Sequence, residues 1–192
     1  MKKLIIITVL LIHILAISGC SLNVGNLSKE EAPVRQAVID AVEAVKEYDT
    51  EKMAEFFSDD KSEFEGITEE YNEFMKKVCG KLTYKINSAK KMDDTLYTVK
   101  LSVSTVDIPD IIERSISYFK EHSEKFLNTP QEEVVNVLFK KCIEIAEKED
   151  IKYISKDIEV TVKKVDSKWI PEFLEEEKNI LFGNLDKVAA LL

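Results

Sequence analysis

Cysteine and histidine are the residue types best suited to nucleophilic or metal chemistry, and this chain contains few of them. It has three cysteines, Cys20, Cys79 and Cys142, and two histidines, of which only His122 lies outside the apolar N-terminal stretch. No pair of them has the short spacing typical of zinc ligands. His122 stands in the polar stretch KEHSEK, which predicts an exposed side chain rather than a catalytic base. The sequence therefore predicts neither a metal site nor a catalytic residue.

The charge of the chain restricts its partners. It carries 36 acidic and 27 basic residues, with a formal charge of −9, which argues against nucleic acid as a partner because binding phosphates requires a basic face. Acidic runs such as Asp59-Asp60 and residues 175–177 point to different sides of a helix or loop, so we interpret them as solvated faces. The glycines are isolated, so no phosphate loop and no cofactor are predicted.

The position of Cys20 gives it a different chemistry. Met1-Lys2-Lys3 precedes an almost wholly apolar run of residues 4–17, which ends in Ile17-Ser18-Gly19-Cys20. The run suits a signal peptide and is shorter than the ~20 residues that span a bilayer. The segment resembles the lipobox of bacterial lipoproteins. That resemblance implies that residues 1–19 are removed and that the thiol of Cys20 carries diacylglycerol. The alternatives are an ordinary secretory signal with an incidental cysteine, or an uncleaved anchor.

The next part of the chain changes from a tether to helices and then to strands. Residues 20–32 are polar and unpatterned, which predicts a tether. Apolar residues then recur at helical spacing in three segments, which begin at Pro33, after an Asp49-Thr50 cap, and near Ile67. Gly80 is the predicted terminator of the third helix. After it the period changes to two, with Leu82, Tyr84 and Ile86 and then Tyr97, Val99, Leu101 and Val103. This alternation predicts a hairpin of two half-buried strands.

Residues 108–150 interrupt the strands. Their apolar stripes predict two helices, the second beginning with a capping box at Thr129-Pro130-Gln131-Glu132. Alternation returns at Ile158, Val160 and Val162 and continues through a tight turn at 165–169. Residues 172–192 are helical in composition, with an interruption at Gly183-Asn184.

This order of elements resembles the nuclear-transport-factor-like (cystatin-like) α+β fold, and in particular small bacterial lipoproteins of that type. The resemblance rests on YDTEKM after the first helix, IEVTVKKVDSKW at Ile158–Trp169, and LFGNL near the C-terminus. It implies one domain over residues 33–192, with N-terminal helices packed on a curved antiparallel sheet that forms a cone. Residues 108–150 would be a two-helix insertion. The matching motifs are structural, and none of them is catalytic.

In a cone of this kind, aromatic side chains could line a pocket or simply fill the core. The candidates are Tyr71, Phe74, Tyr84, Tyr97 and Trp169, and filling is the commoner outcome. Outside the cytoplasm, Cys79 and Cys142 could form a disulfide. Each falls on or beside an apolar stripe, so we favour two buried free thiols.

The sequence thus favours a membrane-anchored lipoprotein on the outer face of a bacterial membrane. Its membrane lipid partner is held through Cys20. Its domain is predicted to be non-catalytic and to bind a small apolar ligand or an envelope protein. Two alternatives are an enzyme that uses the cone for hydrolysis or isomerisation, and an accessory subunit of a cell-envelope complex.

Overall fold

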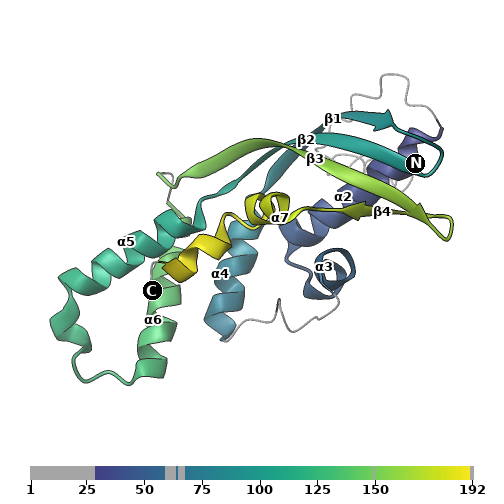
Figure 1. The fold of residues 1–192 in the computed structure, drawn as a ribbon. Coiled ribbons are helices and arrows are strands. Elements are labelled where there is room, and N and C mark those ends of the chain that lie inside the picture. The colour runs from purple at the N-terminus through teal and green to yellow at the C-terminus, as the bar shows by residue number, and fades with distance from the viewer. Residues whose placement is uncertain (1–28, 59–63, 65–67, 149, 191–192) are drawn as a thin grey trace, which may run out of the picture.

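The computed structural model describes residues 29–58, 64, 68–148 and 150–190. The segment 1–19, Cys20 and most of the predicted tether lie outside them. The predicted α+β class is confirmed, because helices pack against one face of an open antiparallel sheet (Figure 1). The four strands pair in sequence order. They are β1 (Thr83–Lys91), β2 (Leu96–Val106), β3 (Tyr153–Val165) and β4 (Lys168–Glu172).

The helices form two groups. The first group packs on the sheet and comprises α2 (Glu31–Glu47), α3 (Thr50–Phe57), α4 (Glu69–Cys79) and α7 (Glu175–Leu181). The second group lies between β2 and β3 and comprises α5 (Ile108–Glu121), the 3-10 helix η2 (Ser123–Phe126) and α6 (Gln131–Ala146). A second 3-10 helix, η3 (Leu185–Ala190), ends the described chain. None of the described helices is long and apolar enough to cross a membrane.

Alternation of side chains gives the sheet one apolar and one polar face. The alternate residues of β2 and β3 predicted to face inward are buried, and together with the apolar stripe of α2 they form one core. On α2, Val34, Val38 and Val42 are fully buried, because positions three and four apart share one face of a helix. The space between helices and sheet is therefore filled by side chains.

Three predicted local features are confirmed. The side chain of Asp49 accepts a hydrogen bond from the backbone N–H of Lys52 and caps α3. Asp166 and Ser167 both have positive φ in the turn between β3 and β4, as a two-residue hairpin turn requires. Gly183 and Asn184 have φ of 64° and 58°, which ends α7 and separates it from η3.

Two predicted helix starts are wrong in detail, and one predicted helix end is confirmed. Gly80 follows α4 directly as its C-cap, in a right-handed conformation with φ −59°. The helix predicted from Pro33 begins at Glu31, since proline is tolerated throughout the first turn. Thr129 does not cap α6, because the helix begins at Gln131 and Thr129 lies one residue before the N-cap position; its N–H is bonded to the carbonyl of Phe126 in the preceding turn. Pro130, with an extended ψ of 145°, stands at the N-cap position without a side-chain bond.

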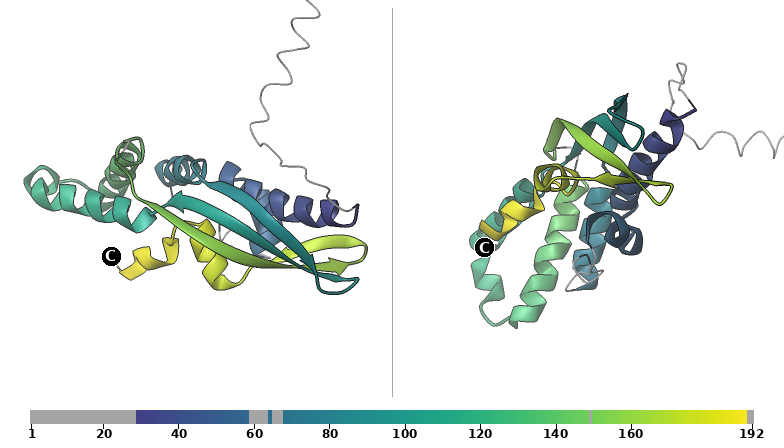
Figure 2. Two further views of the ribbon diagram at one scale, coloured as in Figure 1. Left: turned by 90° about the horizontal axis from the view of Figure 1, so that it is seen from above. Right: turned by 45° about the vertical axis from the view of Figure 1, so that its right-hand side comes forward.

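The segment α5–η2–α6 forms an arm that we call the helical arm. It projects from one end of the molecule, opposite the end where α2 begins (Figures 1 and 2). The arm is held to the body where α6 packs against α4. There the ring of Phe139 lies 5.2 Å from that of Tyr71 and 6.0 Å from that of Phe74, centroid to centroid.

Gly183 lies at the junction where β2 passes into α5. Its carbonyl accepts a hydrogen bond of 3.1 Å from the N–H of Ile108. A Cβ at this position would lie 2.4 Å from the carbonyl oxygen of Val106. The chain can approach this closely only because glycine has no side chain and adopts a positive φ without strain.

We expect Gly183→Ala to lower the free energy of unfolding by about 2–4 kcal/mol, because it combines a backbone clash with left-handed strain. Urea denaturation followed by circular dichroism measures this loss. Asn184→Ala is the matched control: position 184 has a similar φ but already carries a Cβ, so only about 1 kcal/mol of strain is added. Equal losses in the two variants would contradict the close-contact explanation.

Candidate functional site

The five aromatic residues predicted to line a pocket or the core lie in three separate places. Tyr71 and Phe74 fill the interface between α4 and α6, against Phe139. The hydroxyl of Tyr84 on β1 donates to Glu43 Oε1 on α2 at 2.8 Å. Tyr97 and Trp169 form the third group and border a hollow together with charged side chains, and Tyr84 borders another hollow.

The Tyr97–Trp169 hollow has a volume of about 340 Å³. Sheet register creates its aromatic wall, because Tyr97 pairs with Val162 and Lys164 pairs with Trp169 across two successive hydrogen-bonded strand pairs. The two rings meet edge to face at 5.2 Å. The hollow is lined by Glu30, Pro33, Lys91, Asp94, Tyr97, Lys164 and Trp169.

The charges around this hollow balance. The ammonium of Lys91 lies 2.8 Å from Asp94 and 3.2 Å from Glu30. Hydrogen bonds to Asp94 and then to Glu30 raise the pKa of Lys91, and the same contact lowers the pKa of Asp94. The ammonium of Lys164 lies 5.5 Å from the centre of the Trp169 ring. An aromatic wall with a neutral, mixed-charge rim suits amphipathic groups better than a strongly charged ligand.

A second hollow, of about 490 Å³, lies on the polar face of the sheet around Ser102, Ser104 and Asp157. A ladder of hydrogen bonds crosses the strands here. Asn87 donates to Ser102 at 2.8 Å, and Ser102 donates to Asp157 at 2.5 Å. Both of these contacts are exposed, so we interpret this surface as a solvated polar face.

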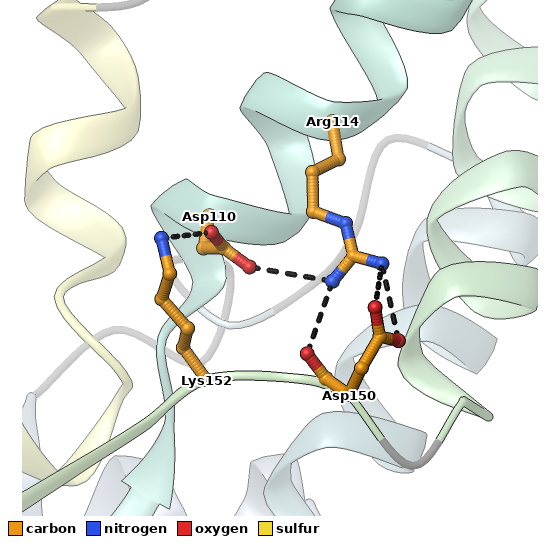
Figure 3. Close-up of polar contacts among 4 residues, drawn as sticks. All are labelled: Asp110, Arg114, Asp150 and Lys152. Carbon is orange, nitrogen blue, oxygen red and sulfur yellow. Dashed lines mark hydrogen bonds and ion pairs between the residues drawn. The ribbon is translucent and has the colours of Figure 1, made fainter.

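The strongest cluster of ionisable groups lies at the base of the helical arm (Figure 3). Asp110, in the first turn of α5, is buried, and one of its oxygens lies 2.5 Å from the ammonium of Lys152. Its other oxygen lies 3.5 Å from Arg114, which also binds the carboxylate of Asp150 at 3.1 Å. Burial, and then the charge of Asp110, raise the pKa of Asp107.

This cluster, which we call the Asp110 cluster, ties α5 to the start of β3. Asp110 lines neither hollow, and its two oxygens face the protein's own cations. A general acid or base must reach a substrate proton directly or through one water molecule. The geometry therefore supports a structural role for Asp110.

Cys79 and Cys142 are buried free thiols in the structure. Burial raises the pKa of Cys79 to about 12. Burial also raises the pKa of Cys142 to about 11, against the opposing effect of Ser115, whose oxygen lies 3.2 Å from the sulfur. Almost no thiolate forms at neutral pH at such values, so these side chains act as small apolar core residues.

His122 was predicted to be exposed, but the structure places it half-buried at the end of α5. Its Nδ1 lies 2.9 Å from the carbonyl of Tyr118, and its ring stacks on that of Tyr118 at 4.3 Å. The free carbonyls at a helix C-terminus attract such a donor. Within the described ranges, no group of three or more histidine, cysteine, aspartate or glutamate side chains is arranged to hold a metal ion.

Several residues of these sites were missed in the sequence. Phe139 follows Val135 by four positions, so the helical period of the arm could have identified it as an interface residue. Lys164 directly precedes the predicted tight turn at 165–169, and the register of that turn places it opposite the predicted candidate Trp169. The pairing of Asp110 with Lys152 joins two distant segments, and no periodic pattern connects them.

We expect Asp110→Asn to lower the free energy of unfolding by about 1–2 kcal/mol. The loss is smaller than for a fully buried pair because Lys152 can regain solvent when the carboxylate is removed. Asp150→Asn is the matched control, since its side chain is 71% exposed and surface ion pairs contribute about 0–1 kcal/mol. Urea denaturation of both variants measures the difference. A larger loss for Asp150→Asn would contradict the assigned role of Asp110.

No family model, curated protein or solved structure matches this chain. Function is therefore inferred from the sequence motifs and from the geometry described above.

Proposed function

We propose that this protein is a lipoprotein, held on the outer face of a bacterial membrane by acylated Cys20, whose domain binds an envelope protein without catalysing a reaction. The lipobox-like segment Ile17-Ser18-Gly19-Cys20 supports the anchor. Two acyl chains provide stable attachment where one chain would bind only reversibly.

We further propose that the domain is of the nuclear-transport-factor-like (cystatin-like) type. The order of helices followed by an antiparallel sheet supports this, as does the Asp49 cap after the first helix. The Gly183 junction lies in the third motif on which the resemblance rests. The long helical arm between β2 and β3 is a departure from a minimal domain of this type.

The main observation that supports the proposed binding of a protein partner is the incomplete burial of the helical arm. No described residue from Ile116 to Lys141 is buried, although both helices have apolar stripes. Leu127 at the tip is 77% exposed, the largest fraction among the large apolar residues described. An apolar stripe that the chain itself covers only in part is typical of a helix that contacts a partner.

The same structure gives less support to the other functions considered. A small apolar ligand would need space between helices and sheet, where Val99, Leu101 and Val160 are fully buried in the core. An enzyme would need an accessible acid or base, whereas Asp110 faces its own cations. An accessory subunit of an envelope complex agrees with the proposed partner binding.

The anchor is tested by metabolic labelling with a fatty acid. Wild-type chain is expected to incorporate the label, and Cys20→Ser is expected to remain an unprocessed, unlabelled precursor, because it lacks the thiol that forms the thioether. Cys142→Ser is the control, since its thiol is buried. Label in Cys20→Ser would disprove the assigned attachment site.

The partner-binding surface is tested by photo-crosslinking in intact cells, with a photoreactive residue at exposed position Lys125 beside Leu127. We expect one discrete adduct with an envelope protein, and we expect Leu127→Asp to reduce it roughly tenfold, since a charge cannot enter an apolar contact without cost. A photoreactive residue at Lys100, exposed on the polar sheet face, is the control. The same adduct from both positions, or an adduct insensitive to Leu127→Asp, would contradict the proposed surface.

A further inference from the structure

Three segments far apart in sequence meet at the end of the molecule opposite the helical arm (Figures 1 and 2). They are the start of α2, the turn between β1 and β2, and the turn between β3 and β4. Lys91 joins the first two through its ion pair with Glu30. The N–H of Lys164 joins the second and third through a 2.8 Å bond to the carbonyl of Thr95. We call this region the hairpin end.

The hairpin end exposes apolar side chains. Met92 is 55% exposed, Val165 48% and Ile170 39%, and these are half of the large apolar residues that are exposed in the described chain. In the sheet, Val165 pairs with Lys168 and Ile170 pairs with Lys163. Apolar and basic side chains therefore share the outer surface of this hairpin.

The hairpin end also differs in charge from the rest of the chain. Residues 29–31, 90–94 and 163–169 contain six lysines and five carboxylates, whereas the whole chain has a charge of −9. With a net charge of about +1, this end is not repelled by an anionic surface as the acidic chain as a whole is. The lysine stems can lie along apolar surface while their ammonium groups remain at the level of phosphate groups.

The chain leaves the domain toward Cys20 at this same end. Lys29 follows Cys20 by nine residues, a length that spans at most about 32 Å when fully extended. A lipid on Cys20 therefore confines the start of α2 to the vicinity of the bilayer. The hairpin end is the face of the domain that such an anchor holds nearest to lipid.

We propose that the hairpin end docks on the phospholipid surface, an inference that rests on the proposed lipid anchor. Met92 and Val165 enter the interfacial layer, and Lys163, Lys164 and Lys168 lie among the phosphates. Trp169 lies at headgroup level, where aromatic side chains with one polar edge are favoured. Docking directs the helical arm away from the membrane and presents its tip to envelope proteins.

Trp169 is the single tryptophan of the chain, so its fluorescence reports on this end alone. The full chain is reconstituted into vesicles of phosphatidylcholine and phosphatidylglycerol that carry bromine on upper acyl carbons. We expect strong quenching of Trp169 relative to the same vesicles without bromine. The double variant Met92→Asp, Val165→Asp is expected to shift the docking equilibrium roughly tenfold or more toward the undocked state and to remove most of the quenching.

The matched control is the double variant Tyr153→Asp, Leu174→Asp. It replaces two apolar side chains that are 50% and 70% exposed and introduces the same two charges outside the hairpin end, so it is expected to leave quenching unchanged. Absence of quenching in the wild type overturns the proposal, as does quenching that the double variant does not reduce. Fatty-acid label on the same samples separates the two proposals. Incorporated label without quenching would contradict the docking proposal and support the lipid anchor. Vesicle-dependent quenching without label would support docking and contradict the lipid anchor.

Discussion

The contact between the backbone of Gly183 and the start of α5 is the constraint on which the arrangement of this fold depends. At that point the end of β2, the first turn of α5 and the loop after α7 share one small space. The neighbouring N–H of Asp107 is bonded to the carbonyl of Lys152, just before β3. The sheet, the helical arm and the C-terminal segment therefore meet at one backbone junction, and the Asp110 cluster strengthens it through side chains.

Most of the fold could be predicted from periodicity. The apolar stripe of α2 and the alternation in β2 and β3 both result from burial of one face. Such burial produces a hydrophobic period of about 3.6 residues in a helix and 2 in a strand, which can be recognised in the sequence. Helix ends were harder, because they depend on local hydrogen bonds. At Thr129 the residue types of a capping box are present, yet the backbone N–H of that residue is used by the preceding turn. The helix begins one residue later than the motif predicts, because Pro130 has a non-helical ψ of 145° and itself stands at the N-cap position.

The candidate sites were less predictable because they are assembled from segments with no common period. The Tyr97–Trp169 hollow needs the start of α2 beside two hairpins, and only tertiary packing brings Glu30 to Lys91. The five aromatic candidates were chosen for residue type alone. Three of them, Tyr71, Phe74 and Tyr84, lie away from this hollow and make contacts elsewhere. Asp110 was not predicted as a site residue, because a single aspartate after a proline forms no spacing pattern that indicates a functional role. Its importance comes from Lys152, which lies just before β3, and from Arg114, which lies one helical turn further along α5.

The bulge in β1 affects how separate copies of the protein interact. β1 is an edge strand, and its pairing register shifts between Ile86 and Ser88. Lys85, Lys90 and Lys91 also lie along it. A kinked, basic edge cannot pair continuously with a flat strand from another molecule, which is how natural sheets avoid edge-to-edge aggregation. Copies crowded together on a surface would thus remain separate, even though each sheet has a free edge.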